Sequence, residues 1–193
     1  MLAYVFWHAP REGTDPDAYE DALIAFHGAL HEAPHETPPQ GLRMSAVYRH
    51  YALPWAPPSM FVYEDWYLVD SFAALGTLNA AAVSGSRRPS HDAAARASSW
   101  GAGGVYASRG DDATTAGHFT YWISKPGGMD YESFYDTLRA SSGVETGVWQ
   151  RQLVLGPAAE FCIRTASRLD LDELDPFESA SHTVYTGASI TGE

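Results

Sequence analysis

The sequence predicts an α+β protein made of two copies of one βαββαβ unit, packed sheet against sheet. The first 40 residues return in altered form 115 positions later, with no gap needed. In both copies an aromatic strand is followed by a turn, an acidic helix start and an amphipathic helix. An internal repeat of this length implies two similar supersecondary units. The constant offset relates these pairs: Tyr4 and Phe119, Trp7 and Trp122, Tyr19 and Phe134, Asp21 and Asp136, Leu23 and Leu138.

The first copy, residues 1–108, alternates strand and helix patterns. Asp15-Pro16-Asp17 is typical of a helix start, because a carboxylate caps the first turn and proline fits there. Apolar residues from Tyr19 to Leu30 follow at helical spacing. Asp70-Ser71 caps a second helix that runs through Val83. The predicted strands are 3–9, 42–52, 60–69 and 103–108. Residues 84–101, with Arg87, Arg88, His91 and Arg96, are expected to form a loop with one helical turn, as a lid or a spacer.

The second copy, residues 118–193, follows a polar linker at 109–117 that has no periodicity. It contains a strand, a helix and a hairpin that turns at Gly156-Pro157. Residues 169–181 are acidic and interrupted by Pro176, so the second copy is degenerate at its C-terminal end, where a last strand begins at His182. The βαββαβ order is the ferredoxin-like pattern.

Each unit covers only one face of its four-stranded sheet with helices, so the other face needs a partner. A tandem chain satisfies this need internally. We therefore expect a pseudo-twofold α/β barrel with its helices outside and a ligand cavity between the sheets. The alternative is two separate units whose open faces are used in a homodimer.

Composition excludes several classes of function. The net charge is −12 without a local Lys/Arg cluster, which disfavours nucleic acids and anionic membrane surfaces. A single cysteine, Cys162, lies in an apolar run and is expected to be a buried strand residue rather than part of a disulfide or metal cluster. The N-terminus is typical of a strand rather than a signal peptide, and no run reaches the ~20 apolar residues of a membrane helix. We expect a cytoplasmic protein.

Two carboxylates are candidates for acid–base chemistry. Aligning the third strands 95 positions apart (Glu64 on Ala159) places Asp65 opposite Glu160 in the repeat. Strand alternation then turns Asp65 and Tyr67 toward the space between the sheets, and Trp66 and Leu68 toward the helices. A carboxylate desolvated among aromatic rings has a raised pKa and can exchange protons. The alternative is an ion pair, of Asp65 with Arg49, or of Glu160 with Arg151 or Arg164.

Several histidines are further candidates. His8 ends the first strand and corresponds to Ile123, so it is either an interior functional residue or a strand-end residue in solvent. His50 shares a strand face with Tyr48, where the pair can hold a phenolic ligand or serve in packing. His27 and His31 lie one helical turn apart, a spacing that suits a metal only with a third ligand.

Lys125-Pro-Gly-Gly-Met-Asp-Tyr-Glu-Ser-Phe134 resembles the opening of EthD-type members of the dimeric α/β-barrel superfamily. Those proteins often carry a histidine two helical turns after the aromatic residue. His27 holds that position after Tyr19, whereas the second copy has Ser142 and the first copy lacks the Lys-Pro-Gly turn. The resemblance implies that His27 points inward, as a base or a haem ligand. The superfamily includes cofactor-free monooxygenases, isomerases, cyclases and haem proteins.

The sequence contains no Gly-rich phosphate loop, zinc-protease motif or nucleophile elbow. We therefore expect binding, and conversion without a cofactor or metal, of a small aromatic or polyketide-like molecule, in an EthD-like or antibiotic-biosynthesis-monooxygenase-like setting. The alternatives are a non-catalytic interaction module with a filled core, and a haem protein. The candidate catalytic residues are His8, His27, His50, Asp65 and Glu160; the candidate pocket residues are Tyr48, Arg49, Tyr63, Tyr67 and Arg151.

Overall fold

One curved antiparallel sheet organises the chain. The computed structural model describes residues 1–193 except 34, 59–60, 111–114, 143–146, 153–157 and 189–193. In these residues nine strands pair in the order β8-β5-β7-β6-β4-β1-β3-β2-β9. The strands are β1 (Leu2–Pro10), β2 (Leu42–His50), β3 (Val62–Val69), β4 (Ser98–Arg109), β5 (Phe119–Ile123), β6 (Val148–Arg151), β7 (Phe161–Thr165), β8 (Phe177–Ala180) and β9 (His182–Ala188).

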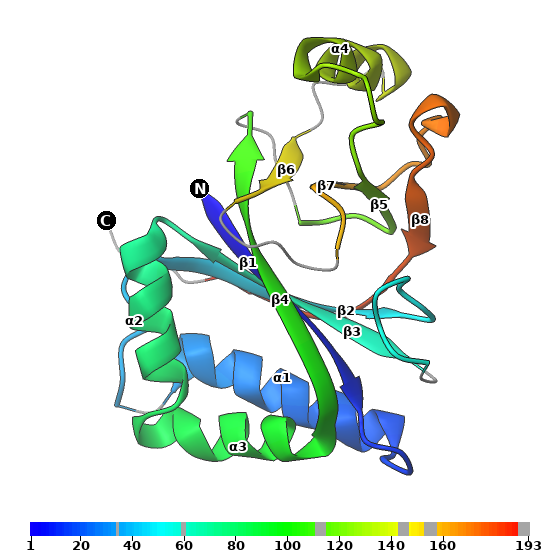
Figure 1. The fold of residues 1–193 in the computed structure, drawn as a ribbon. Helices are drawn as coiled ribbons and strands as arrows, with labels where there is room; N and C mark the ends of the chain where they lie inside the picture. The colour runs from blue at the N-terminus through cyan, green and yellow to red at the C-terminus, as the bar shows by residue number, and fades with distance from the viewer. Residues whose placement is uncertain (34, 59–60, 111–114, 143–146, 153–157, 189–193) are drawn as a thin grey trace.

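In the described part of the chain, four α-helices cover the outer faces of this sheet (Figure 1). Their bounds are α1 (Pro16–Glu32), α2 (Phe72–Ala82), α3 (Arg88–Ala97) and α4 (Tyr131–Ser142). The two predicted caps are confirmed: Asp15 accepts a hydrogen bond from the backbone of Asp17, and Ser71 accepts one from that of Ala74. None of the helices in the described residues is both long and apolar enough to cross a membrane.

The sheet has two halves that follow the same internal order. The first half, β4-β1-β3-β2, packs against α1, α2 and α3, and the second half, β8-β5-β7-β6, packs against α4. Strands β4 and β6 join the halves on one side. On the other side, β9 pairs with β2 and only Ser181 separates it from β8. The sheet is therefore curled so that its two end strands, β8 and β9, meet at Ser181.

Two segments differ from the prediction. Residues 84–101 form a 3-10 turn, helix α3 and the start of β4, so the predicted helical turn is part of a longer helix and the rest is not a loop. Pro89 fits the first turn of α3, and the alanines that follow favour helix. The acidic segment 169–181 forms a 3-10 turn and strand β8 instead of a broken helix. Asp175 ends that turn with a left-handed backbone, and Pro176 cannot continue a helix because it lacks an N–H.

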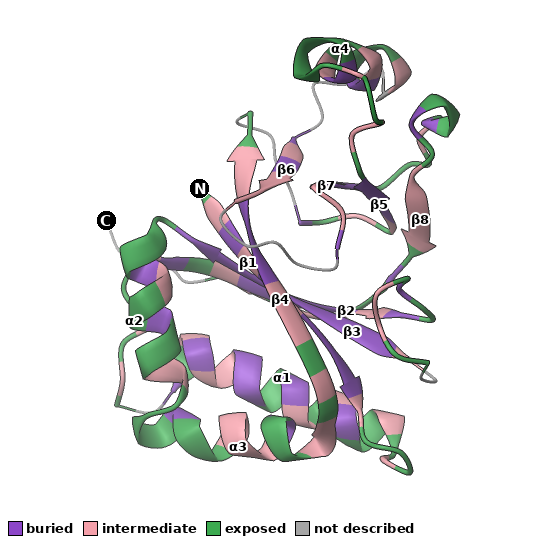
Figure 2. Cartoon of the chain, in the orientation of Figure 1, coloured by how far each residue is buried: buried purple, intermediate pink, exposed green. Residues whose placement is uncertain are grey.

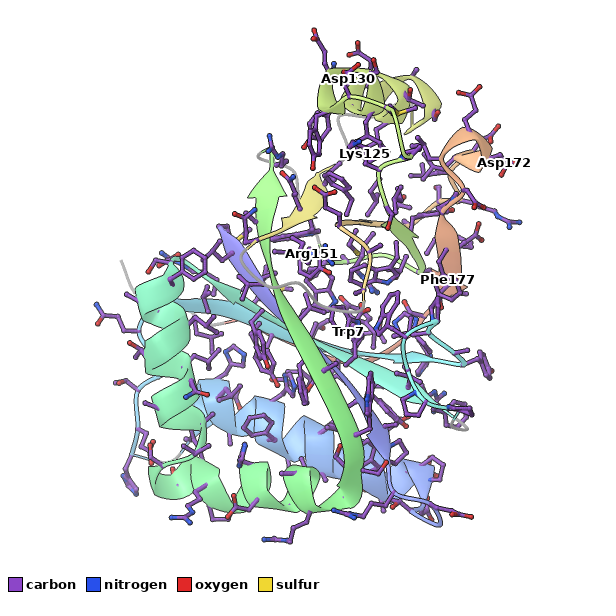
Figure 3. The ribbon with its side chains drawn as sticks, in the orientation of Figure 1. Trp7, Lys125, Asp130, Arg151, Asp172 and Phe177 are labelled. Atoms are coloured by element: carbon purple, nitrogen blue, oxygen red, sulfur yellow. The ribbon has the colours of Figure 1, made fainter. Side chains whose placement is uncertain are left out.

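The space between the two halves is a packed aromatic core, which corrects the prediction of a ligand cavity there. Four buried tryptophans form its centre: Trp7, Trp66, Trp122 and Trp149. Figure 3 shows side chains filling the region around Trp7 between the halves, and Figure 2 shows that β3 and β5 are largely buried whereas much of β4 is not. A hollow of about 540 Å3, lined by Trp55, Trp122 and Phe177, opens at one end of this core.

A buried ion pair ties the two halves together inside this core. Arg164 of β7 donates to Glu64 of β3 at 2.9 Å, and both side chains are fully buried. Glu64 also accepts hydrogen bonds from the indoles of Trp7 (2.9 Å) and Trp66 (2.6 Å). Burial alone would raise the pKa of Glu64, but His50, Arg164 and the Trp66 hydrogen bond lower it to about 2. The carboxylate is therefore charged and neutralised from the other half.

We predict that Arg164→Met destabilises the protein by about 3–5 kcal/mol, because it leaves the Glu64 charge buried without its main partner. Urea unfolding measures the loss. The control is Arg43→Met, which breaks the exposed Arg43–Asp70 pair and should cost less than about 1 kcal/mol. Equal losses in the two variants would contradict the structural role assigned to Arg164.

Candidate functional site

The site lies on the helix side of the first half-sheet, in a cavity of about 630 Å3 between β1, β3 and helices α1, α2 and α3. A volume of this size suits a small-molecule ligand. Apolar and aromatic side chains make most of the wall. Its polar groups include His8, Tyr19, Asp65 and Tyr67. The cavity thus occupies the face opposite to the one that the sequence predicted.

His8 and Asp65 meet at this wall because β1 and β3 are adjacent and antiparallel. His8 Nε2 lies 3.0 Å from Asp65 Oδ1, and its Nδ1 lies 2.6 Å from the hydroxyl of Tyr19 on α1. A carboxylate only accepts, so Nε2 of His8 carries the proton that it donates to Asp65. In the neutral ring Nδ1 is then the acceptor, and the Tyr19 hydroxyl donates to it. The three groups form a chain that starts at the cavity and ends on a carboxylate.

His27 and Tyr67 hold the second oxygen of Asp65. The Tyr67 hydroxyl donates to Oδ2 at 3.0 Å, and His27 Nε2 lies 3.3 Å from the same oxygen. Tyr67 and His27 also stack, with ring centroids 4.9 Å apart. His27 Nδ1 has no hydrogen-bond partner in the part of the chain that is described. A proton on Nε2 leaves Nδ1 as a bare acceptor, which costs less when buried than an unpaired N–H would.

Burial and charge separate the protonation states of the cluster. Burial alone would raise the pKa of Asp65, but His8 and His27 hold it well below its ordinary value. Burial and the Asp65 charge raise the pKa of Tyr67 well above its usual range. Burial likewise raises the pKa of Tyr19. The carboxylate therefore stays charged while the phenols keep their protons.

The predicted faces are wrong for β3 but right for β7, where Phe161 and Ile163 pack under α4 and Cys162 faces the central core. Asp65 and Tyr67 face the helices, whereas Trp66 and Leu68 face the central core. The structure pairs Trp7 with Glu64 and Trp122 with Cys162, so the repeat places Glu64, not Tyr67, at the same register as the buried Cys162. That offset is 98 positions (162 minus 64) rather than 95. An error of three residues reverses every side chain between the two faces.

Two of the predicted catalytic residues lie away from the cavity. His50 is buried in the central core, where Nδ1 contacts Ser179 Oγ at 2.8 Å and Nε2 lies 3.8 Å from Glu64. Glu160 lies on the second half and accepts hydrogen bonds from Tyr131 (2.9 Å) and Gln150 (3.1 Å).

The predicted ion pairs also differ. Arg49 pairs with Glu20 at 2.6 Å rather than with Asp65, and Arg164 pairs with Glu64 rather than with Glu160. Arg151 donates to the carbonyl of Ala158 at 2.6 Å. The observed partners of Glu64 and Asp65 differ from the predicted ones because the two faces of β3 are the reverse of the prediction.

The remaining predicted pocket residues divide between the two cores. Tyr48 lies in the central core, where its hydroxyl donates to the carbonyl of Thr115 and its ring lies under Arg164. Tyr63 lies on the helix side and stacks on His8 with centroids 5.7 Å apart, but its hydroxyl donates to Glu20. Tyr67 is the predicted pocket residue that lines the cavity.

Sequence reasoning missed Tyr19 and Glu64 as polar participants. The helical spacing of Tyr19 places it on the apolar face of α1. Only its position one turn after the cap, facing the strand that carries His8, indicates a polar role. Glu64 was detectable, since it precedes Asp65 on a strand whose eight residues are all buried. Among the described residues, no group of three or more His, Cys, Asp or Glu side chains is arranged to hold a metal ion.

Comparison with solved structures finds the same fold in three proteins. A candidate monooxygenase of Fusobacterium nucleatum subsp. nucleatum aligns with a TM-score of 0.64 and 7% identity over 97% of this chain and 94% of that one. A candidate monooxygenase of Lactobacillus acidophilus aligns at 0.55 and 8% identity, over 97% and 95%. An anthrone oxidase-like protein aligns at 0.54 and 12% identity, over 98% and 93%.

These identities establish a shared fold and leave function to the site. No family model matches the sequence, and no curated protein matches it. The neighbours are of nearly the same length as this chain, so the likeness covers the whole sheet and its helices.

We predict that Asp65 makes the free energy of unfolding depend on pH in the acid range. Its folded pKa lies below the ordinary value of 3.8, so its contribution is complete above that pH and is lost as the pH falls further. Asp65→Asn removes this pH-dependent contribution to the free energy of unfolding. The difference in unfolding free energy between wild type and Asp65→Asn should shrink as the pH falls below 3.8. Urea unfolding at stepped pH measures it, and a difference that stays constant down to pH 2 would contradict the assignment.

Proposed function

We propose that the chain binds a small planar aromatic molecule in the helix-side cavity and converts it without a cofactor, as an oxygenase of phenolic or polyketide-like carbon acids. The observation that carries the proposal is the Tyr19–His8–Asp65 chain, which joins the wall of an aromatic cavity to a buried carboxylate. The names of the structural neighbours, monooxygenase and anthrone oxidase-like, agree with it at the level of the fold.

We further propose that the fold consists of two tandem ferredoxin-like repeats, 1–108 and 118–193, joined by 109–117 and closed into a pseudo-twofold α/β barrel of the EthD-like or antibiotic-biosynthesis-monooxygenase-like kind. The matching orders β4-β1-β3-β2 and β8-β5-β7-β6 support this. In the second repeat, Ile123 and Ile163 stand where His8 and Asp65 stand in the first. The chemistry is therefore assigned to the first repeat alone.

The proton step follows from the hydrogen-bond directions. A ligand with an acidic C–H or O–H gives its proton to Tyr19 Oη while the Tyr19 proton passes to His8 Nδ1. The imidazolium that forms is stabilised by Asp65 at 3.0 Å, as in other tyrosine– or serine–histidine–carboxylate arrangements. Tyr67 and His27 keep Asp65 charged and oriented. The apolar walls exclude water, which strengthens these interactions.

The oxidant is molecular oxygen. For a methylene carbon flanked by aromatic rings, proton loss gives a carbanion that transfers one electron to O2. The resulting radical and superoxide combine to form a C–O bond, and the His8 proton returns to the peroxide. Loss of the second C–H proton and cleavage of the O–O bond release water and leave a carbonyl. The balance is CH2 + O2 → C=O + H2O.

The packed central core matches what a non-catalytic module would have, but the helix-side cavity gives the chain a separate place for a ligand. A haem group is not favoured by the site, because both ring nitrogens of His8 are engaged and His27 does not line the cavity. An isomerase would use the same proton chain without oxygen, and oxygen consumption separates the two reactions.

We predict that Tyr19→Phe lowers turnover by about 10²–10⁴-fold and leaves binding nearly unchanged, because it removes only the hydroxyl of the proton chain. The measurements are oxygen uptake with anthrone as the probe and anaerobic binding of the same probe. His8→Ala and Asp65→Ala should abolish turnover; because each leaves buried polar groups without a partner, urea unfolding checks that both variants remain folded.

The matched control is Tyr121→Phe, which changes an equally buried tyrosine on β5 in the second half. Its hydroxyl accepts a hydrogen bond from the backbone of Leu169, far along the chain from His8. Tyr121→Phe should retain turnover. Full oxygen uptake by Tyr19→Phe, or equal loss in both variants, would defeat the assigned relay.

A further inference from the structure

Two glycines on β4 lie beneath aromatic side chains that line the cavity. Gly101 and Gly103 are two residues apart, so they share the helix-facing side of the strand. A Cβ added at Gly101 would lie 2.5 Å from Cζ of Phe6, and one added at Gly103 would lie 2.9 Å from the hydroxyl oxygen of Tyr4. Neither glycine has a left-handed backbone, so turn geometry does not require glycine at these positions.

The rings have one open direction in which to move. Phe6 is flanked on its own strand by Tyr4, 6.3 Å away between centroids, and by His8, 5.5 Å away. Strand β4 lies behind it, because β1 and β4 are paired along their length. The remaining side is the cavity, which both Phe6 and Tyr4 line. A methyl group at Gly101 or Gly103 would therefore push an aromatic ring into the ligand space.

We propose that Gly101 and Gly103 are specificity-determining residues that set the width of the cavity and admit fused-ring ligands. Their missing side chains let the ring ends of Phe6 and Tyr4 extend over β4. Larger residues at these two positions would leave room for a ligand with a single aromatic ring only. This inference rests on the proposed function of the same cavity, and it adds the size class of the ligand and the residues that control it.

The test measures anaerobic affinities of phenol, 2-naphthol and anthrone, so that binding is separated from oxidation. Gly101→Ala is expected to weaken anthrone binding by at least about tenfold and phenol binding by less than about twofold, because overpacking opposes only the ligand that reaches the displaced ring. Gly103→Ala should act in the same direction through Tyr4. Thermal unfolding checks that both variants fold.

Two further variants make the test specific. Gly28→Ala on α1 adds a methyl group where no atom lies within 4 Å, outside the cavity wall, and should leave all three affinities unchanged. Gly101→Ala combined with Phe6→Leu should recover anthrone binding, because the smaller side chain accommodates the added methyl group.

The outcomes are distinguishable. If the wild type binds none of the three probes, the proposed function and this inference both fall. If the wild type binds anthrone and Gly101→Ala binds it equally well, only the inference falls. Loss of phenol and anthrone binding in equal proportion would also overturn it, since that pattern indicates general damage to the site rather than control of width.

Discussion

The structure depends on how two consecutive buried carboxylates on strand β3 are neutralised by residues of other elements. Glu64 and Asp65 point to opposite faces of a strand that is buried along its whole length, so neither charge reaches water. Each therefore needs partners from the layer that it faces. Arg164 of the second half neutralises Glu64, and His8 and His27 surround Asp65. The Arg164–Glu64 pair holds the two halves of the sheet together, and the contact between His27 and Asp65 holds α1 against the sheet.

This arrangement also explains why the chemistry is confined to one side of one half. On the core face, Glu64 is saturated by two indoles and an arginine, which leaves it no capacity to exchange protons. On the helix face, Asp65 is linked through His8 to a phenol at a cavity wall. In the proposed repeat, the second half has Cys162 and Ile163 at the corresponding positions. Its helix face is a closed apolar core under α4, which contains Tyr121, Phe134 and Phe161.

Much of the fold could be predicted from local signals. The Asp15 and Ser71 caps and the periodicity after them place α1 and α2 correctly, and strand alternation finds β1, β2 and β3. The pairing of the last strand could not be predicted in this way. Strand β9 pairs with β2, a partner about 140 residues earlier, and nothing within His182–Ala188 encodes that choice. The cysteine was correctly placed as a buried strand residue.

The site was predicted in part, for a reason that lies in the period of a strand. His8, Asp65, His27 and Tyr67 were all candidates, and the structure brings them into one cluster. The face predicted for Asp65 and Tyr67 was wrong, because two short apolar strands can be aligned with a three-residue slip and still match in hydrophobicity. Only pairing between strands fixes the register, since Trp7 opposite Glu64 and Trp122 opposite Cys162 leave one solution. Hydrophobic pattern determines that β3 is buried, and long-range pairing determines which of its carboxylates meets the ligand.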